Sequence, residues 1–217
     1  DASNASARAV YHHWGFSEDR VVLVAPLETL GERLVPGRHA ESFASLHVQT
    51  DAVVDVERAV NALAPRLGSA GSEVVGPRNG WVTVYDAAVD DDPTALLRFA
   101  REISSRMGAV VVTLSLEVDQ VVRMIALDRG GIVDEYLSVP EFYGPLPPGD
   151  VIGLAANPTV LARLTGADPA RVRDVARTAT ATDDLPPARE LLAALAQTLG
   201  LEGAEHGYAG LQRDDDS

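Results

Sequence analysis

The chain contains no cysteine and no lysine, so all 18 of its basic residues are arginines. The lack of cysteine excludes disulfide bonds, thiolate metal sites and cysteine nucleophiles, and it leaves the redox compartment undetermined. The lack of lysine excludes Schiff-base chemistry and the lysine of a phosphate-binding loop. Several large groups of enzyme mechanisms are therefore closed to the residues of this chain.

Positive charge is also scarce. The 32 acidic and 18 basic residues give a formal net charge of -14 at pH 7. A negative charge of this size opposes general binding to nucleic acid and to anionic membranes. No long apolar run is present, so we expect no membrane span. The first residues show no charged-then-apolar signal pattern, and we expect a cytoplasmic protein.

The common catalytic and cofactor motifs are missing as well. The chain has no glycine-rich phosphate loop, no nucleophile elbow and no histidine–glutamate metal helix. Three aspartates, Asp90 to Asp92, stand together before Pro93. An aspartate followed by proline is typical of the start of a helix, so helix capping explains this group better than a cation does. We therefore expect no metal site and no bound cofactor.

The segment from Trp81 to Asp86 reads as the central strand of a sheet. It follows an Asn79-Gly80 turn, which predicts a β-hairpin with residues 73–75 because both residues tolerate positive φ. Alternating or continuous apolar patterns predict the other strands, and 3.6-residue patterns ending at a glycine predict helices. The strands are expected at 43–49, 110–116, 121–127 and 132–137, and the helices at 53–67, with Asp51 as its cap, and at 93–107.

This β-α-β-β-α-β order, followed by a hairpin, predicts an α+β fold with a ferredoxin-like, or split βαβ, sheet and a C-terminal helical unit. The chain divides into five predicted segments. They are an N-terminal arm at 1–19, the sheet domain at 20–140, a Pro/Gly linker at 141–156, the helical unit at 157–200 and an acidic tail at 201–217. Within the first two segments we also note His12-His13, a short strand at 21–25 and a helix from Pro26.

In a split βαβ sheet both helices cover one face, and Leu46, Val48, Val82 and Val84 are expected on it. The opposite face would then be open, with a mixture of polar and aromatic side chains. This mixture suggests a ligand site in which His47 or Asp134 acts as acid or base and Arg123 holds an anion. A solvated or dimer-forming face is the alternative. The candidate ligand-binding residues are His47, Tyr85, Thr113, Ser115, Arg123, Asp134 and Tyr136.

Residues 157–177 support a different class of protein. The segment resembles the helix-turn-helix of bacterial repressors, with Gly166 in the turn and Val172 and Val175 at apolar positions. Four arginines and two aspartates make it locally basic. Arg163, Arg171 and Arg173 would then contact DNA, although Asp168 would face the phosphates.

Two further stretches carry a family resemblance. Residues 78–86, RNGWVTVYD, and residues 131–140, GIVDEYLSVP, resemble an uncharacterised family of soluble bacterial α+β proteins over about residues 43–144. The resemblance implies the fold and carries no activity or catalytic residue.

Taken together, these patterns favour a non-enzymatic binding or protein-interaction module, with a homodimer through the open sheet face as one candidate assembly. A transcription regulator that uses residues 157–177 and a small-molecule-binding enzyme on the open face remain as alternatives.

Overall fold

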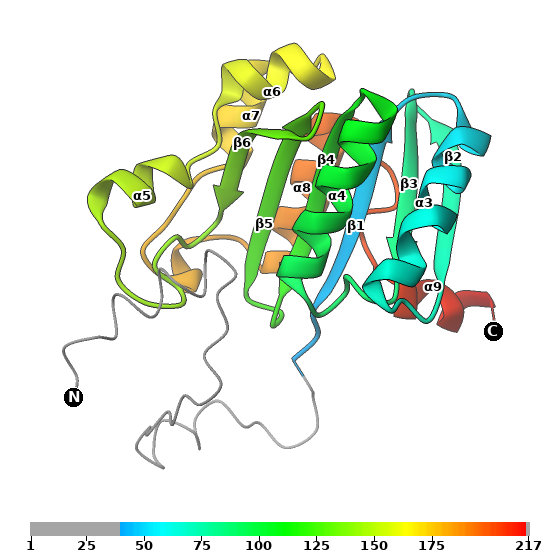
Figure 1. The fold of residues 1–217 in the computed structure, drawn as a ribbon. Helices are drawn as coiled ribbons and strands as arrows, with labels where there is room; N and C mark the ends of the chain where they lie inside the picture. Colours follow the sequence, from blue (N-terminus) through cyan, green and yellow to red (C-terminus); the bar gives the residue numbers. More distant parts are fainter. Residues whose placement is uncertain (1–39, 216–217) are drawn as a thin grey trace.

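The computed structural model describes residues 40–215, with side chains as far as Leu211. The predicted N-terminal arm, the strand at 21–25, the helix from Pro26 and the histidines before residue 40 lie outside the described residues. Figure 1 shows the arrangement of the described part, in which helices cover both faces of one sheet.

The sheet has six strands in the order β2-β3-β1-β4-β5-β6, and all neighbouring strands are antiparallel. The α+β class predicted from the sequence is confirmed. The strands predicted from residue 43 onwards are all present, with boundaries that shift by at most a few residues. They are β1 (Phe43–Gln49), β2 (Ser72–Arg78), β3 (Trp81–Asp86), β4 (Val110–Glu117), β5 (Val121–Asp128) and β6 (Gly131–Leu137).

Two long helices connect strands that are not neighbours in the sheet. Helix α3 (Val53–Leu67) joins β1 to β2, and helix α4 (Pro93–Met107) joins β3 to β4. Both lie on the same face (Figure 1), where their apolar sides pack on Leu46, Val48, Val82 and Val84. The first four strands thus follow the β-α-β-β-α-β order, and β5 and β6 extend the sheet as a hairpin beyond β4.

Local sequence explains most of the element boundaries. Asn79 and Gly80 both have positive φ (54° and 78°), as the hairpin prediction requires. The Asp92 carboxylate accepts hydrogen bonds from the backbone N–H groups of Thr94 and Ala95, which confirms that it caps α4. The predicted cap of α3 is wrong, because Ala52 occupies the N-cap position and no side chain caps it. Asp51 is exposed and contributes only its backbone carbonyl there.

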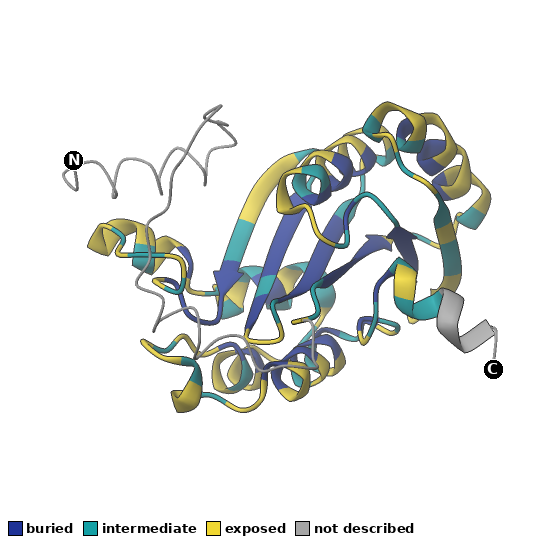
Figure 2. Ribbon diagram, turned by 90° about the horizontal axis from the view of Figure 1, so that it is seen from below, coloured by how far each residue is buried: buried dark blue, intermediate teal, exposed yellow. Residues whose placement is uncertain are grey.

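The second face of the sheet is covered by the C-terminal helices. They are α6 (Pro158–Thr165), α7 (Pro169–Val175) and α8 (Ala188–Leu199), of which α8 packs on β4 and β5. Leu192 and Leu195 of α8 join one apolar cluster with Trp81 and Tyr136 of the sheet. Figure 2 shows the buried sheet between two helical layers. The C-terminal helices are therefore part of the main body.

The predicted linker and tail both differ from the structure. The Pro/Gly segment contains a short helix, α5 (Pro148–Gly153), and its end is tied down because Leu154 is buried and its carbonyl accepts from Leu137 N–H. Residues 200–207, which we call the C-terminal strap, pack on the sheet, and α9 (Tyr208–Asp215) follows. Within the described part of the chain, no helix has the length and apolar character needed to cross a membrane.

Candidate functional site

The predicted ligand-binding residues lie on two opposite faces of the sheet. The cross-strand register places Thr83 and Val112 directly opposite His47, on the face that α8 covers. Thr113, by contrast, lies opposite Leu46, and Ser115 lies opposite Arg123, on the face of α3 and α4. The expectation of one shared face is therefore wrong. His47, Tyr85, Asp134 and Tyr136 share one side, and Thr113, Ser115 and Arg123 share the other.

Neither side is open. His47 and Tyr136 are 0% exposed, and Tyr85, Thr113 and Ser115 are buried as well. The helices of the C-terminal unit and the strap fill the face on which a pocket or a dimer contact was predicted. An assembly through an open sheet face has no surface to use among the described residues.

His47 lies at the centre of a chain of buried hydroxyl groups. Its Nε2 is 3.0 Å from Ser45 Oγ and its Nδ1 is 3.1 Å from Thr83 Oγ1. The single hydroxyl hydrogen of Thr83 is donated to the carbonyl of Glu202 at 3.1 Å. Thr83 must therefore accept from Nδ1–H. In the neutral imidazole the proton is thus on Nδ1, and Nε2 accepts from the Ser45 hydroxyl.

A serine hydroxyl that donates to a histidine nitrogen is the geometry of a nucleophile and its base. In this protein Ser45 and His47 are both 0% exposed, so no substrate reaches them in this conformation. Burial also lowers the pKa of His47 from 6.5 to about 3, which makes it a poor proton acceptor near neutral pH. The chemistry of this pair therefore depends on whether its cover can move.

The two tyrosines of this face anchor the segments above them. Tyr85 donates its hydroxyl hydrogen to Gly203 O at 2.5 Å, and Tyr136 donates to Arg177 O at 2.9 Å. Burial raises the pKa of both phenols. Both hydroxyls thus stay protonated and act as structural donors.

Asp134 lies at the other end of the same face, beside the start of α6. Its carboxylate accepts from the backbone N–H of Asn157 at 3.0 and 3.2 Å. Partial burial raises the pKa of Asp134 to about 6, although this hydrogen bond acts in the opposite direction. His47 and Asp134 pair with different residues, so they form no acid–base pair.

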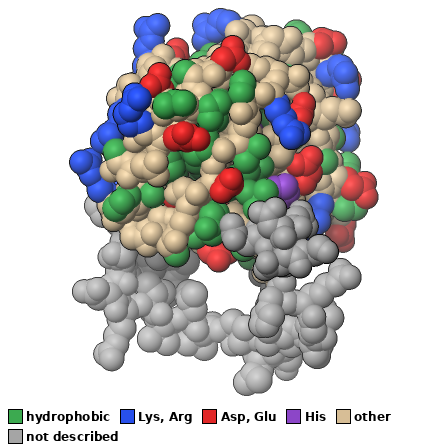
Figure 3. Space-filling model, turned by 90° about the vertical axis from the view of Figure 1, so that its right-hand side faces the viewer, with side chains coloured by type: hydrophobic (Ala, Val, Ile, Leu, Met, Phe, Trp, Pro, Cys, Tyr) green, Lys and Arg blue, Asp and Glu red, His purple; other side chains and the backbone are tan. Residues whose placement is uncertain are grey.

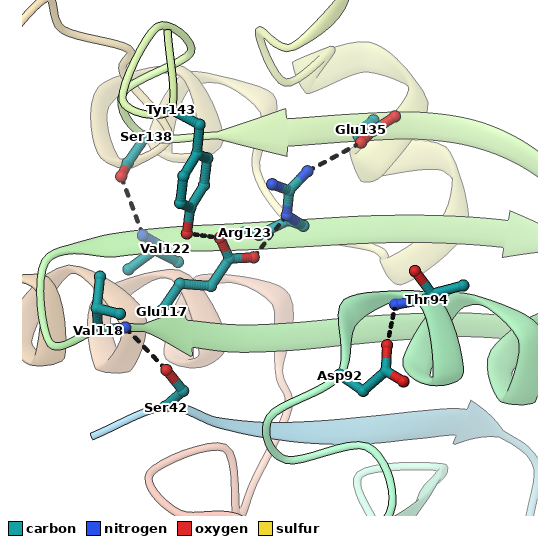
Figure 4. A network of polar contacts seen from close by, with 10 residues as sticks. All are labelled: Ser42, Asp92, Thr94, Glu117, Val118, Val122, Arg123, Glu135, Ser138 and Tyr143. Atoms are coloured by element: carbon teal, nitrogen blue, oxygen red, sulfur yellow. Dashed lines mark hydrogen bonds and ion pairs between the residues drawn. The ribbon is translucent and has the colours of Figure 1, made fainter. Parts of the chain in front are cut away.

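Arg123 forms the centre of an ion-pair network with residues that the sequence analysis did not select. Its Nε lies 2.6 Å from Glu117 Oε1 and its Nη1 lies 3.3 Å from Glu135 Oε1. Tyr143, in the loop after β6, donates its hydroxyl to Glu117 Oε2 at 2.6 Å. Figure 4 shows the four side chains converging over β4 to β6. Desolvation by burial acts to lower the Arg123 pKa, but the charges of Glu117 and Glu135 and the hydrogen bond to Glu117 together raise it above its ordinary value.

This network does not form an anion site. Two carboxylates surround one guanidinium, so the cluster carries an excess of negative charge, and both oxygens of Glu117 already have partners. The predicted role of Arg123 in holding an anion is thus contradicted by its neighbours. No sequence signal indicated the network, because Glu117 and Tyr143 are 26 residues apart and meet only through the pairing of β4 with β5 and of β5 with β6.

The three candidate DNA-binding arginines lie on the helix pair that the sequence analysis predicted. Asn157 caps α6, Asp168 caps α7, and Gly166 ends α6 in the left-handed conformation. Arg163, Arg171 and Arg173 are exposed, and none of them forms an ion pair with another described residue. Val172 is fully buried, so Arg171 and Arg173 project on either side of α7.

Asp90, between β3 and α4, belongs to the aspartate group assigned to helix capping from the sequence, but it is Asp92 that caps α4. The Asp90 carboxylate accepts from the backbone N–H groups of Ala44, Tyr208 and Ala209 at 3.1 to 3.3 Å. It thereby joins the start of β1 to the first turn of α9. Among residues 40–211 no group of acidic or histidine side chains has the arrangement of a metal site.

Two of the large apolar side chains that are most exposed to solvent belong to the segment around α5. Ile152 is 74% exposed and Tyr143 is 59% exposed, and no residue of α5 itself is buried. We call residues 140–154 the apolar arm. It is fixed at both ends, because Tyr143 bonds to Glu117 and Leu154 packs with Val121, Leu137 and Val139.

The free edge strand β2 is a weaker candidate for a contact surface. Its pairing with β3 is irregular between Val75 and Arg78, and Pro77 in that stretch has no N–H to donate. Figure 3 looks onto this side of the molecule and shows acidic and basic side chains among the hydrophobic ones. An interrupted, charged edge of this kind resists the addition of another strand.

Comparison of the chain with protein-family models, with curated proteins and with solved structures finds no match. The fold and the site described above are therefore the observations that bear on function.

Proposed function

We propose that the protein is a non-enzymatic protein-interaction module and that the apolar arm is its docking element. The observation that carries this proposal is a fixed segment that presents Ile152 and Tyr143 to solvent while burying none of α5. A six-residue helix gains little stability on its own, so exposed apolar groups held on one are typical of a contact surface.

Charge defines the partner further. Glu141 and Asp150 are the exposed ionisable side chains of the arm, and both are acidic. Tyrosine and apolar side chains at the centre of an interface supply most of the binding energy, and charges at the rim set specificity. The partner is accordingly a protein surface with an apolar centre and basic residues around it.

The variant Ile152→Asp tests this proposal. We expect it to weaken binding of the partner by at least tenfold, because it places a charge in the apolar centre of the contact, and a loss of about 1.4 kcal/mol already corresponds to tenfold. The partner is first isolated by cross-linking in extract of the source cells. The Kd of the purified pair is then measured by isothermal titration calorimetry.

Val54→Asp is the matched control. Val54 is 64% exposed on α3, so the same chemical change is made at a similarly exposed position outside the arm. The control should bind like the unmodified protein, and both variants should keep its melting temperature. Equal affinity of Ile152→Asp and the unmodified chain would refute the arm as the docking element.

A DNA-binding regulator is the second candidate, and it is favoured by the exposed arginines of the α6–α7 pair, of which Arg163, Arg171 and Arg173 form no ion pair with another described residue. If these helices bind DNA, affinity for mixed genomic fragments must fall steeply between 50 and 200 mM salt, since phosphate contacts release counterions. Arg171→Ala with Arg173→Ala should then reduce binding and the salt slope together. Electrophoretic mobility shifts measure both. Absence of salt-dependent binding would remove this candidate.

A further inference from the structure

The C-terminal strap is held by side chains that bind its backbone. Thr83 donates to Glu202 O, Tyr85 donates to Gly203 O, and Asn79 Nδ2 lies 3.5 Å from Gly200 O. Each of these donors belongs to β3 or to the turn before it. Arg78 and Asn79 also hold the Glu202 carboxylate at 3.1 and 3.0 Å. The strap is therefore a distinct cover laid along β3.

The fit beneath this cover is close. A Cβ atom at Gly203 would lie 2.2 Å from the Tyr85 hydroxyl, and one at Gly207 would lie 2.1 Å from an Asp90 oxygen. Ala204 is 1% exposed, and the Tyr85 ring stacks on His206 at 5.3 Å. While the strap is in place, the side chains of His47 and Tyr85 beneath it are therefore withdrawn from solvent, at 0% and 2% exposed.

Among residues 40–211, His47 is the one histidine under this cover, and the Thr83 hydroxyl links it to the strap. Within the described part of the chain, the ring nitrogens bond to Ser45 and Thr83, and no carboxylate forms an ion pair with His47. On its own strand the neighbour is Ser45, β4 presents Val112, and α8 adds leucines to the same cluster. The strap's ionisable side chains, Glu202, Glu205 and His206, are exposed or half-buried, as is Arg78. Tyr85 stays protonated.

We propose that the strap is a pH-sensitive cover, and that protonation of His47 favours its release and exposes the face of β1 and β3 beneath it. The exposed surface would present Trp81 and Tyr85 beside the Ser45–His47 pair.

The direction in which pH shifts the opening equilibrium follows from the linkage between opening and proton binding to His47. With the strap closed, the pKa of His47 is about 3 because of burial, and with the strap open it returns towards 6.5. The open form therefore binds the proton more tightly between these values, and the opening equilibrium shifts towards it as pH falls below 6.5. For one group the shift amounts to about 25-fold between pH 7 and pH 5.

The absence of native cysteine makes a direct measurement possible. In the full chain, Ala204→Cys places a single thiol on the buried side of the strap. Ala100→Cys places one in α4, in the other layer, where Ala100 is 0% exposed. Thiol labelling rates at pH 7 and pH 5, divided by the rate of a model thiol peptide at the same pH, give the accessible fraction. We expect Cys labelling at position 204 to exceed that at position 100 at least tenfold, and to rise about 25-fold on acidification.

Two further variants show whether His47 or Asp90 is the group whose protonation drives the rise in labelling. His47→Gln keeps a neutral hydrogen-bonding side chain and should abolish the rise. Asp90→Asn should keep it, because the Asp90 carboxylate, whose pKa is also raised by burial, holds α9 and not the strap carbonyls. Equal accessible fractions at positions 100 and 204 would show that the strap opens only when the domain unfolds. If labelling at position 204 did not rise in acid, opening of the strap would not be coupled to protonation of His47. Either of these two results overturns the proposal.

Discussion

Replacement of Arg123 by methionine should destabilise the protein by about 3–5 kcal/mol, the usual cost of leaving a buried charge without its partner. The Arg123 and Glu117 side chains are only 12% and 8% exposed, so water cannot replace the lost ion pair. Methionine fills most of the volume of the arginine side chain, so the lost electrostatic interactions are the main cause of the expected destabilisation. Chemical denaturation followed by circular dichroism would give the free energy of unfolding.

Arg129→Met provides the matched control for that measurement. Its side chain is 81% exposed and lies 3.9 Å from Asp128, so the same substitution should change stability by less than about 0.5 kcal/mol. Adding Glu117→Gln to Arg123→Met should restore part of the loss, because the orphaned buried charge is removed. Similar small losses for Arg123→Met and Arg129→Met would contradict the role assigned to the network.

Replacement of Leu195 by alanine should cost about 2–5 kcal/mol and should lower the stability of the whole described body. Leu195 is fully buried between α8 and the sheet, in the cluster that contains Trp81 and Tyr136. If the C-terminal helices and the sheet unfold together, tryptophan fluorescence and far-ultraviolet circular dichroism will report one transition with the same midpoint.

Gln197→Ala on the exposed side of α8 is the corresponding control, with an expected change within about 0.5 kcal/mol. Two separate transitions, of which Leu195→Ala shifts only one, would show that the C-terminal helices fold independently of the sheet. That outcome would restore the division into two units that the sequence pattern favoured.

The fold was largely predictable because its local signals agree with one another. β1 and β3 have the predicted bounds, and the Asn79-Gly80 turn and the glycine stops of α3 and α4 adopt the conformations that their residue types favour. These features depend on neighbouring residues alone. The α+β class follows from their order.

The site was less predictable because faces and covers depend on distant partners. β4 reads VVVTLSLE and is buried on both faces, so alternation did not show which side Thr113 and Ser115 occupy. The choice is fixed only by pairing with β1 and β5, and a one-residue error moves every side chain to the other face. The sequence pattern predicted a tail there because the charged residues of the segment can be seen in the sequence itself. The buried contacts of the strap are made with β3, which is far away in the chain, so no local pattern indicated them.

The contacts between the strap and β3 also set the order of events when the chain is made. Thr83 and Tyr85 bind residues 119 and 118 positions later in the chain. At typical rates of synthesis, roughly 6 to 24 seconds separate the appearance of these partners at the ribosome. The sheet can pair during that interval, but its aromatic and histidine-bearing side stays uncovered until residues 200–207 have been made. A nascent chain of this protein thus presents to the cell a surface that the finished molecule hides.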